Sequence, residues 1–152
     1  MAAKEKSSEE IQKAKLLNHV PCYDSTESSL AAARFKARAW AHEYNTYFPP
    51  VASSPNFDTL AAERLERLKS ILGHVGTDVF IEPPFSIDYG CNISLGNRFY
   101  ANFNLTILDC SLVTIGDRVM FGPNVSIFAA THETEVQSRR ENIEYGRPVV
   151  IG

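Results

Sequence analysis

Apolar residues recur every six positions along the second half of the chain, and this period limits the possible folds more than any other feature. The leading residues form three blocks that begin at Val75, Leu95 and Ile115, so the longer repeat is 20 residues, or three hexads plus two extra residues. A helix repeats at about 3.6 residues and a strand at about 2, so neither element explains the period. We predict a triangular prism in which each hexad is one short strand and a corner.

The hexads also predict which residues form the core of this prism. The leading residues are expected to stack in register from coil to coil: Val75, Ile81, Ile87, Leu95, Ala101, Ile107, Ile115, Phe121 and Ile127. The positions four residues later are mostly apolar or small and are also expected to face inward, so Cys91 is predicted to be a core residue. Corners favour permissive residues such as asparagine and glycine, and glycine follows the leading residue in four of the nine hexads.

The repeat breaks off after Ile127. The residues that follow are charged and carry no period, and we predict a loop over 131–148 that projects from the prism. The last two residues, Ile151 and Gly152, resemble the start of another hexad. Residues 75–152 are therefore predicted to form about three coils, cut short as a fourth begins. A polar loop of this length inside a compact repeat is usually functional or disordered.

Helical patterns precede the repeat. Residues 1–9 are predicted to be a disordered tail and residues 10–74 a small helical domain. Within that domain one helix is expected to have its N-cap at Ser25 or Thr26 and to bury an apolar stripe. A later helix around Leu65 is amphipathic, and its charged residues are expected on a solvated face. The fold class is thus mainly β, with a helical N-terminal domain.

Composition excludes several classes of protein. The net charge of −3 leaves no basic excess for binding nucleic-acid phosphates. No segment approaches the ~18 apolar residues that a membrane span needs. The three cysteines form no C-x-x-C pair, which argues against a zinc knuckle or a disulfide scaffold and favours a reducing compartment. We expect a cytoplasmic protein that binds neither nucleic acid, membrane nor metal.

Three segments carry a resemblance to a known family. They are KAKLLNHVPCYDSTESSLAAARFKARAWAHEYN, IEPPFSIDYGCNISLGNRFYANFNLTILD, and FGPNVSIFAATH followed by EYGRPVVIG. In these segments the chain resembles the maltose/galactoside O-acetyltransferase group of the hexapeptide-repeat acyltransferases. The resemblance implies a left-handed parallel β-helix, acetyl-CoA as co-substrate, a sugar acceptor and a homotrimer with each site between neighbouring prisms. Family members continue for several more coils, so most coenzyme-binding residues are expected downstream of Gly152.

Acetyl transfer from a thioester to a hydroxyl needs a base for the hydroxyl proton and donors for the oxyanion that develops. His132 lies where the repeat breaks into the loop, and loop residues on a rigid scaffold often carry function. The other three histidines lie in or beside the helical segments and are expected to have no such role. By resemblance, His132 matches the catalytic histidine of the group. Asn102 matches a site residue, which we expect to be a donor to the transition state.

Four carboxylates are the candidate acceptor contacts, because charged hydrogen bonds commonly hold sugar hydroxyls. By resemblance Asp24 matches an acidic sugar-binding residue of the helical domain. Asp88 aligns with a sugar-contacting position that is serine in the galactoside enzymes. Glu144 is expected to orient the histidine or the acceptor. Asp109 is included as a carboxylate near a corner, although lone carboxylates there are more often solvated.

Two other functions stay open at this point. A zinc-dependent hydratase on a β-helix needs about three histidine ligands for each metal, and His132 is the only histidine after residue 75. A truncated, catalytically inactive member of the acetyltransferase family would keep the acceptor-side residues without the coenzyme-binding coils. The leading prediction is an acetyl-CoA-dependent O-acetyltransferase that acts on a sugar hydroxyl by direct transfer.

Overall fold

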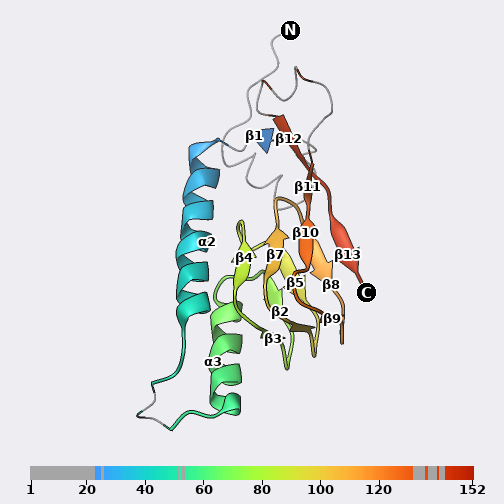
Figure 1. The fold of residues 1–152 in the computed structure, drawn as a ribbon. Coiled ribbons are helices and arrows are strands. Elements are labelled where there is room, and N and C mark those ends of the chain that lie inside the picture. Colours follow the sequence, from blue (N-terminus) through green and yellow to red (C-terminus); the bar gives the residue numbers. More distant parts are fainter. Residues whose placement is uncertain are drawn as a thin grey trace.

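Short parallel strands are stacked into a prism, and two helices lie at the end of the stack formed by the first coil (Figure 1). This computed structural model describes residues 23–24, 26–50, 52, 54–131, 136, 140 and 143–152. The predicted tail, residues 1–9, lies outside the described residues. Among those that are described, no helix is both long enough and apolar enough to cross a membrane.

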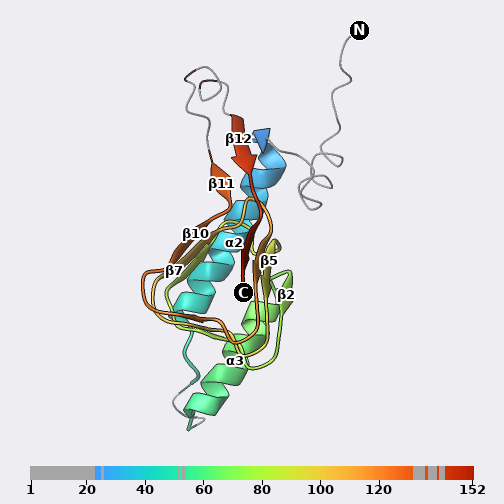
Figure 2. The same ribbon diagram turned by 90° about the vertical axis from the view of Figure 1, so that its right-hand side faces the viewer.

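Three parallel sheets form the faces of the prism, and each gains one strand from every coil. The first contains β2 (His74–Val75), β5 (Ile93–Leu95), β8 (Val113–Ile115) and β13 (Val149–Ile151). The second contains β3 (Phe80–Ile81), β6 (Tyr100–Ala101) and β9 (Met120–Phe121), and the third β4 (Phe85–Ile87), β7 (Leu105–Leu108) and β10 (Ser126–Phe128). Figure 2 shows the successive coils lying over one another.

The register of these strands confirms the 20-residue repeat. Val75 pairs with Leu95, Leu95 with Ile115, and Ile115 with Ile151. The last pair shows that the chain re-enters the same sheet after the loop, as the hexad at Ile151 predicts. All nine leading residues are buried or partly buried; Phe121 in the third coil is among the partly buried ones.

The prediction that Cys91 is a core residue is wrong, because its side chain is exposed. Two extra residues follow the third hexad of each coil, and they shift the inward positions along the chain. Ile93 and Val113 point inward there instead, and both have 0% exposure. In β4, β5 and β8 the core residues are therefore the two on either side of the central residue, as the alternation of a β-strand requires.

Space, rather than backbone angle, explains most of the glycines. A Cβ on Gly76 would lie 2.7 Å from the backbone nitrogen of Asn97, and one on Gly96 would lie 2.5 Å from the carbonyl carbon of Gly116. No side chain fits where the coils approach so closely. Five corner residues have the positive φ angles expected of asparagine and glycine. Two of them are asparagines, Asn104 and Asn124, and three are charged residues, Asp78, Arg98 and Arg118.

Helix α2 (Ser28–Thr46) covers the first coil and replaces the coil that would lie beneath it (Figure 1). The Tyr44 hydroxyl donates to the carbonyl of Ile81 at 2.7 Å. The Asn45 amide donates to the carbonyl of Phe85 at 3.0 Å and accepts from its N–H at 2.8 Å, as a neighbouring strand would. The N-cap is Glu27, slightly later than the predicted Ser25 or Thr26.

Helix α3 (Phe57–Lys69) packs beside the first coil and buries a charge. Asn56 caps it by accepting from the N–H of Thr59 at 2.9 Å. The prediction that all its charged residues are solvated is wrong for Arg64, whose exposure is 5%. The Arg64 guanidinium pairs with Glu82 at 3.1 Å, and this ion pair joins the helix to the prism.

We predict that Asn45→Ala destabilises the fold, since it leaves the N–H and carbonyl of Phe85 without the partners they have here. Buried polar groups without partners cost about 1–3 kcal/mol each. Denaturant unfolding measures the change in free energy. Thr46→Ala is the matched control, because the Thr46 hydroxyl bonds only within its own helix, to the carbonyl of His42. Equal losses in both variants would show that Asn45 does not cap the stack.

Candidate active site

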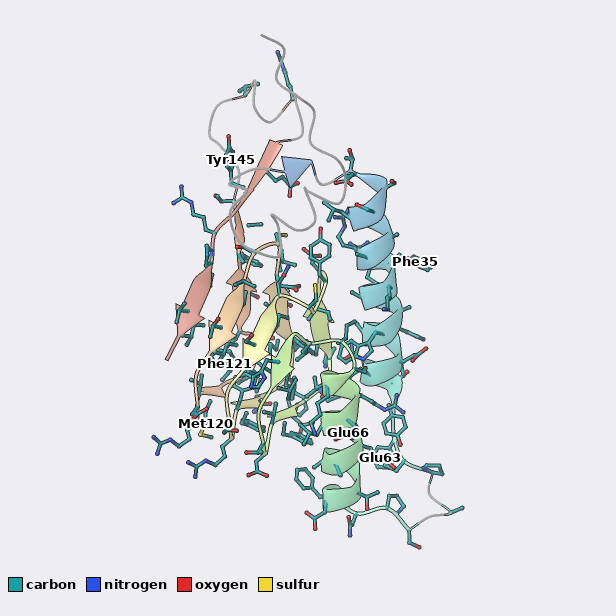
Figure 3. All side chains as sticks on the ribbon, turned by 180° about the vertical axis from the view of Figure 1, so that it is seen from behind. Phe35, Glu63, Glu66, Met120, Phe121 and Tyr145 are labelled. Carbon is teal, nitrogen blue, oxygen red and sulfur yellow. The ribbon has the colours of Figure 1, made fainter. Side chains whose placement is uncertain are left out.

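A small antiparallel sheet joins the N-terminal segment to the base of the loop. It consists of β1 (Tyr23–Asp24), β12 (Ile143–Gly146) and β11 (Ala130–Thr131), in the order β1-β12-β11. Asp24 pairs with Ile143, and Thr131 pairs with Tyr145. Figure 3 shows Tyr145 at this end of the molecule. The predicted projecting loop therefore starts and ends on paired strands rather than on free chain.

This sheet brings three of the predicted site segments together. Asp24 lies on β1, the half-buried Glu144 lies on β12 opposite Tyr23, and Thr131 is the residue directly before His132. His132 and the side chain of Asp24 lie outside the described residues. The sequence did not reveal this pairing, because a two-residue strand leaves no periodic signal.

A cluster of polar side chains lies at the corner between β4 and β5. An Oδ of Asp88 accepts from the Cys110 thiol at 3.4 Å, and Arg34 of α2 donates to the Tyr89 hydroxyl at 2.7 Å. Burial raises the pKa of Tyr89 to about 12, although the hydrogen bond from Arg34 opposes the rise. Sequence reasoning gave Arg34 and Tyr89 no role, and nothing local could, since 55 residues separate them.

Asp109 is buried inside the stack, whereas the sequence predicted a residue that contacts the substrate. Its exposure is 0%, and its carboxylate accepts from the N–H groups of Asp88 at 3.1 Å, Tyr89 at 2.9 Å and Asn92 at 3.4 Å. Burial raises the pKa of Asp109, and these backbone hydrogen bonds oppose the rise. The general expectation that a lone corner carboxylate is solvated also fails here, because the carboxylate points into the stack.

Asn102 lies directly after β6, at the corner that leads to β7. Its side chain is half-buried, and its carbonyl oxygen accepts from the N–H of Phe103 at 2.7 Å. Its own N–H donates to the carbonyl of Phe121 in the next coil at 3.0 Å. The backbone of Asn102 is thus fixed by stacking, which a donor of fixed direction requires.

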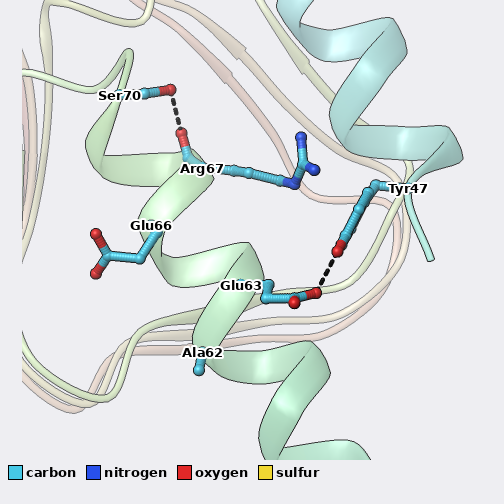
Figure 4. Close-up of a pocket in the computed structure, with 6 residues that line it drawn as sticks. All are labelled: Tyr47, Ala62, Glu63, Glu66, Arg67 and Ser70. Atoms are coloured by element: carbon cyan, nitrogen blue, oxygen red, sulfur yellow. Dashed lines mark hydrogen bonds between the residues drawn. The ribbon is translucent and has the colours of Figure 1, made fainter. Parts of the chain in front are cut away.

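A shallow hollow elsewhere on the protein does not belong to this group. Tyr47, Ala62, Glu63, Glu66, Arg67 and Ser70 line it (Figure 4). Figure 3 shows Glu63 and Glu66 at the opposite end of the molecule from Tyr145. Its polar groups already have partners: Glu63 accepts from the Tyr47 hydroxyl, and the Arg67 guanidinium lies 3.6 Å from the centre of the Tyr47 ring.

Comparison with known proteins shows where such a fold occurs. The maltose acetyltransferase hexapeptide capping motif matches residues 22–76. A putative acetyltransferase of Saccharomyces cerevisiae is 39% identical over 140 residues, which are 90% of this chain and 67% of that protein. The chain belongs to the maltose/galactoside O-acetyltransferase group of the hexapeptide-repeat acyltransferases. The described prism matches the β-helix that this family implies.

Two solved structures resemble this one closely. A maltose O-acetyltransferase from Clostridium difficile 630 has a TM-score of 0.76 and 29% identity, covering 90% of this chain and 67% of that one. A galactoside acetyltransferase in complex with coenzyme A has a TM-score of 0.72 and 31% identity, covering 84% of this chain and 59% of that one. The chain thus spans about two thirds or less of the lengths of these proteins.

We predict that a variant without residues 1–24 exchanges the amide hydrogens of residues 143–144 faster than the intact chain does. Loss of β1 would leave one edge of β12 unpaired, and unpaired edges open more readily. Hydrogen exchange with mass spectrometry measures this. Residues 105–108 in β7 serve as the internal control, because both neighbours of that strand remain. Unchanged exchange at 143–144 would show that β1 does not secure the loop.

Proposed function

We propose that this chain carries the acceptor side of an acetyl-CoA-dependent O-acetyltransferase that acetylates a sugar hydroxyl. Its membership of the family supports the reaction class, and the galactoside relative that binds coenzyme A supports the acetyl donor. The observation that carries the proposal is the β1-β12-β11 sheet. It aligns the strand of Asp24 with the strands that flank His132 along the chain.

In the proposed reaction His132 is the general base. It takes the proton of the acceptor hydroxyl as that oxygen attacks the thioester carbonyl, and the side-chain amide of Asn102 donates to the resulting oxyanion. When the intermediate collapses, the carbon–sulfur bond breaks and the coenzyme thiolate leaves. The imidazolium of His132 returns the proton to that thiolate. The products are an acetyl ester and free coenzyme A.

The acceptor is proposed to bind between the small sheet and the β4–β5 corner. Asp24, Asp88 and Glu144 supply carboxylates for its hydroxyl groups, and charge-assisted hydrogen bonds of this kind are stronger than neutral ones. Arg34 lies at the same corner and adds a donor beside Tyr89. Three carboxylates and one guanidinium suit a neutral polyol better than an anionic substrate.

The assembly and setting are further parts of the proposal. Following the family, we propose a homotrimer with each site between neighbouring prisms, and coenzyme contacts largely in the part of the relatives' length that this chain does not span. We also propose a cytoplasmic location. Cys91 and Cys110 are thiols rather than parts of a disulfide, which suits a reducing compartment.

We predict that His132→Ala lowers kcat for acetyl transfer by about 10²–10⁴-fold, the usual contribution of a general base. Release of coenzyme A thiol from acetyl-CoA, with maltose or a galactoside as acceptor, measures the rate. Thermal unfolding and sedimentation are expected to stay unchanged, because the sequence predicts that the histidine belongs to the projecting loop. His74→Ala is the control: His74 is an exposed histidine of β2. A near-normal kcat in His132→Ala would remove it from the mechanism.

We predict that Asp24→Asn raises KM for the sugar about 10-fold or more, as expected when a hydrogen bond to a charged group, worth about 1.5–3 kcal/mol, is weakened. KM for acetyl-CoA is expected to change little, because Asp24 lies outside the repeat. Steady-state kinetics with each substrate varied in turn separates the two effects. Equal losses for both substrates would indicate a role in folding.

A further inference from the structure

Asp109 fixes the backbone of the corner in the coil before its own. Its carboxylate accepts from the N–H groups of Asp88, Tyr89 and Asn92. The contact also runs in the other direction, because the Asn92 amide donates to the carbonyl of Asp109 at 2.7 Å. Three hydrogen bonds and one return bond therefore tie positions 88, 89 and 92 to Asp109, directly after β7.

Stacking of the coils does not require this carboxylate. One coil later Ala129 takes the place of Asp109, since Phe128 pairs with Leu108 directly before these two residues. Ala129 is 1% exposed, and its N–H donates to the carbonyl of Leu108 at 3.0 Å. A methyl group therefore fills the same inward place without disturbing the stack.

A buried carboxylate is also costly, because it loses its hydration. The Asn92 side chain adds a second cost: its carbonyl oxygen is buried and has no partner among the described residues. The buried carboxylate of Asp109 and the unpartnered oxygen of Asn92 are both unfavourable, and one coil later Ala129 replaces the carboxylate. We infer that the shape of the segment 88–92 matters for more than stacking. That segment carries Asp88 and Tyr89.

We propose that Asp109 is a positioning residue for the acceptor: it holds Asp88 and Tyr89 in place through their backbone N–H groups and does not touch the sugar. The inference rests on the proposed function. The directions of both side chains follow from the backbone that Asp109 fixes. Asp88 thereby meets the Cys110 thiol, and Tyr89 meets Arg34.

The test compares Asp109→Ala, which copies the third coil, with Asp109→Asn, which keeps the shape but replaces one acceptor oxygen with a donor. Ile107→Val is the matched control, because Ile107 is fully buried in β7, the strand directly before Asp109, and loses only a methyl group. Steady-state kinetics with maltose or a galactoside gives KM for the sugar and KM for acetyl-CoA. Both Asp109 variants are expected to raise KM for the sugar by about 10–100-fold, the scale for a misplaced binding group. KM for acetyl-CoA is expected to stay within about twofold.

A second measurement does not depend on turnover. In a Cys22→Ser, Cys91→Ser background, the rate of Cys110 alkylation by iodoacetamide reports whether the half-buried thiol keeps its contact with Asp88. The Asp109 variants are expected to react several-fold faster than Ile107→Val. The kinetic arm uses each form extended at its C-terminus by the part of the relatives' length that this chain does not span. If none of these extended forms acetylates either sugar, the proposed function fails, and alkylation still judges the positioning role. If the Asp109 variants match Ile107→Val in alkylation rate and in both KM values, the positioning role is wrong. Should Asp109→Ala not fold, Asp109→Asn and Asn92→Ala carry the same comparison.

Discussion

Backbone stacked directly on backbone is the constraint on which the rest of this structure depends. Each coil leaves so little room above Gly76 and Gly96 that a Cβ would lie within 2.7 Å of the next coil. The inward side chains can then meet only their equivalents one coil away, which produces the 20-residue register. Any feature that differs from the repeat must therefore be placed at a corner or at an end of the stack.

The end of the stack at the first coil is one such departure from the repeat. Among the described residues no strand lies beneath the first coil, and α2 supplies the missing partners with side chains instead of backbone. The Asn45 side chain bonds both the N–H and the carbonyl of Phe85, and the Tyr44 hydroxyl donates to the carbonyl of Ile81. The partly buried ion pair of Arg64 and Glu82 fixes the orientation of α3, because it joins α3 to the same coil. Removing one member of a buried ion pair costs more than the pair contributes, so such pairs specify an arrangement better than they stabilise it.

Much of this architecture could be predicted from the sequence, because it is periodic. The prism, the inward rows and the return at Ile151 all follow from the hexads, and the register confirms them. Cys91 and Arg64 were misassigned for local reasons: two extra residues shift the inward positions at one corner, and a neighbouring carboxylate makes the burial of an arginine possible. The β1–β12 pairing and the contact of Arg34 with Tyr89 leave no trace in local pattern, since each joins segments far apart in the sequence.

The placement of the candidate site follows from the same constraint. A break in the repeat is tolerated only if the chain returns to its place in the stack, and β13 does return, with Ile151 over Ile115. The intervening segment is thereby held at both ends by strands of the prism, and the β1-β12-β11 sheet adds a third attachment. Asp109 is a smaller departure of the same kind. At its position a carboxylate takes the place of an inward methyl group, and the rigid stack lets this carboxylate hold a corner. Rigid repeats thus supply fixed anchor points, and the chemistry occupies the few positions that depart from them.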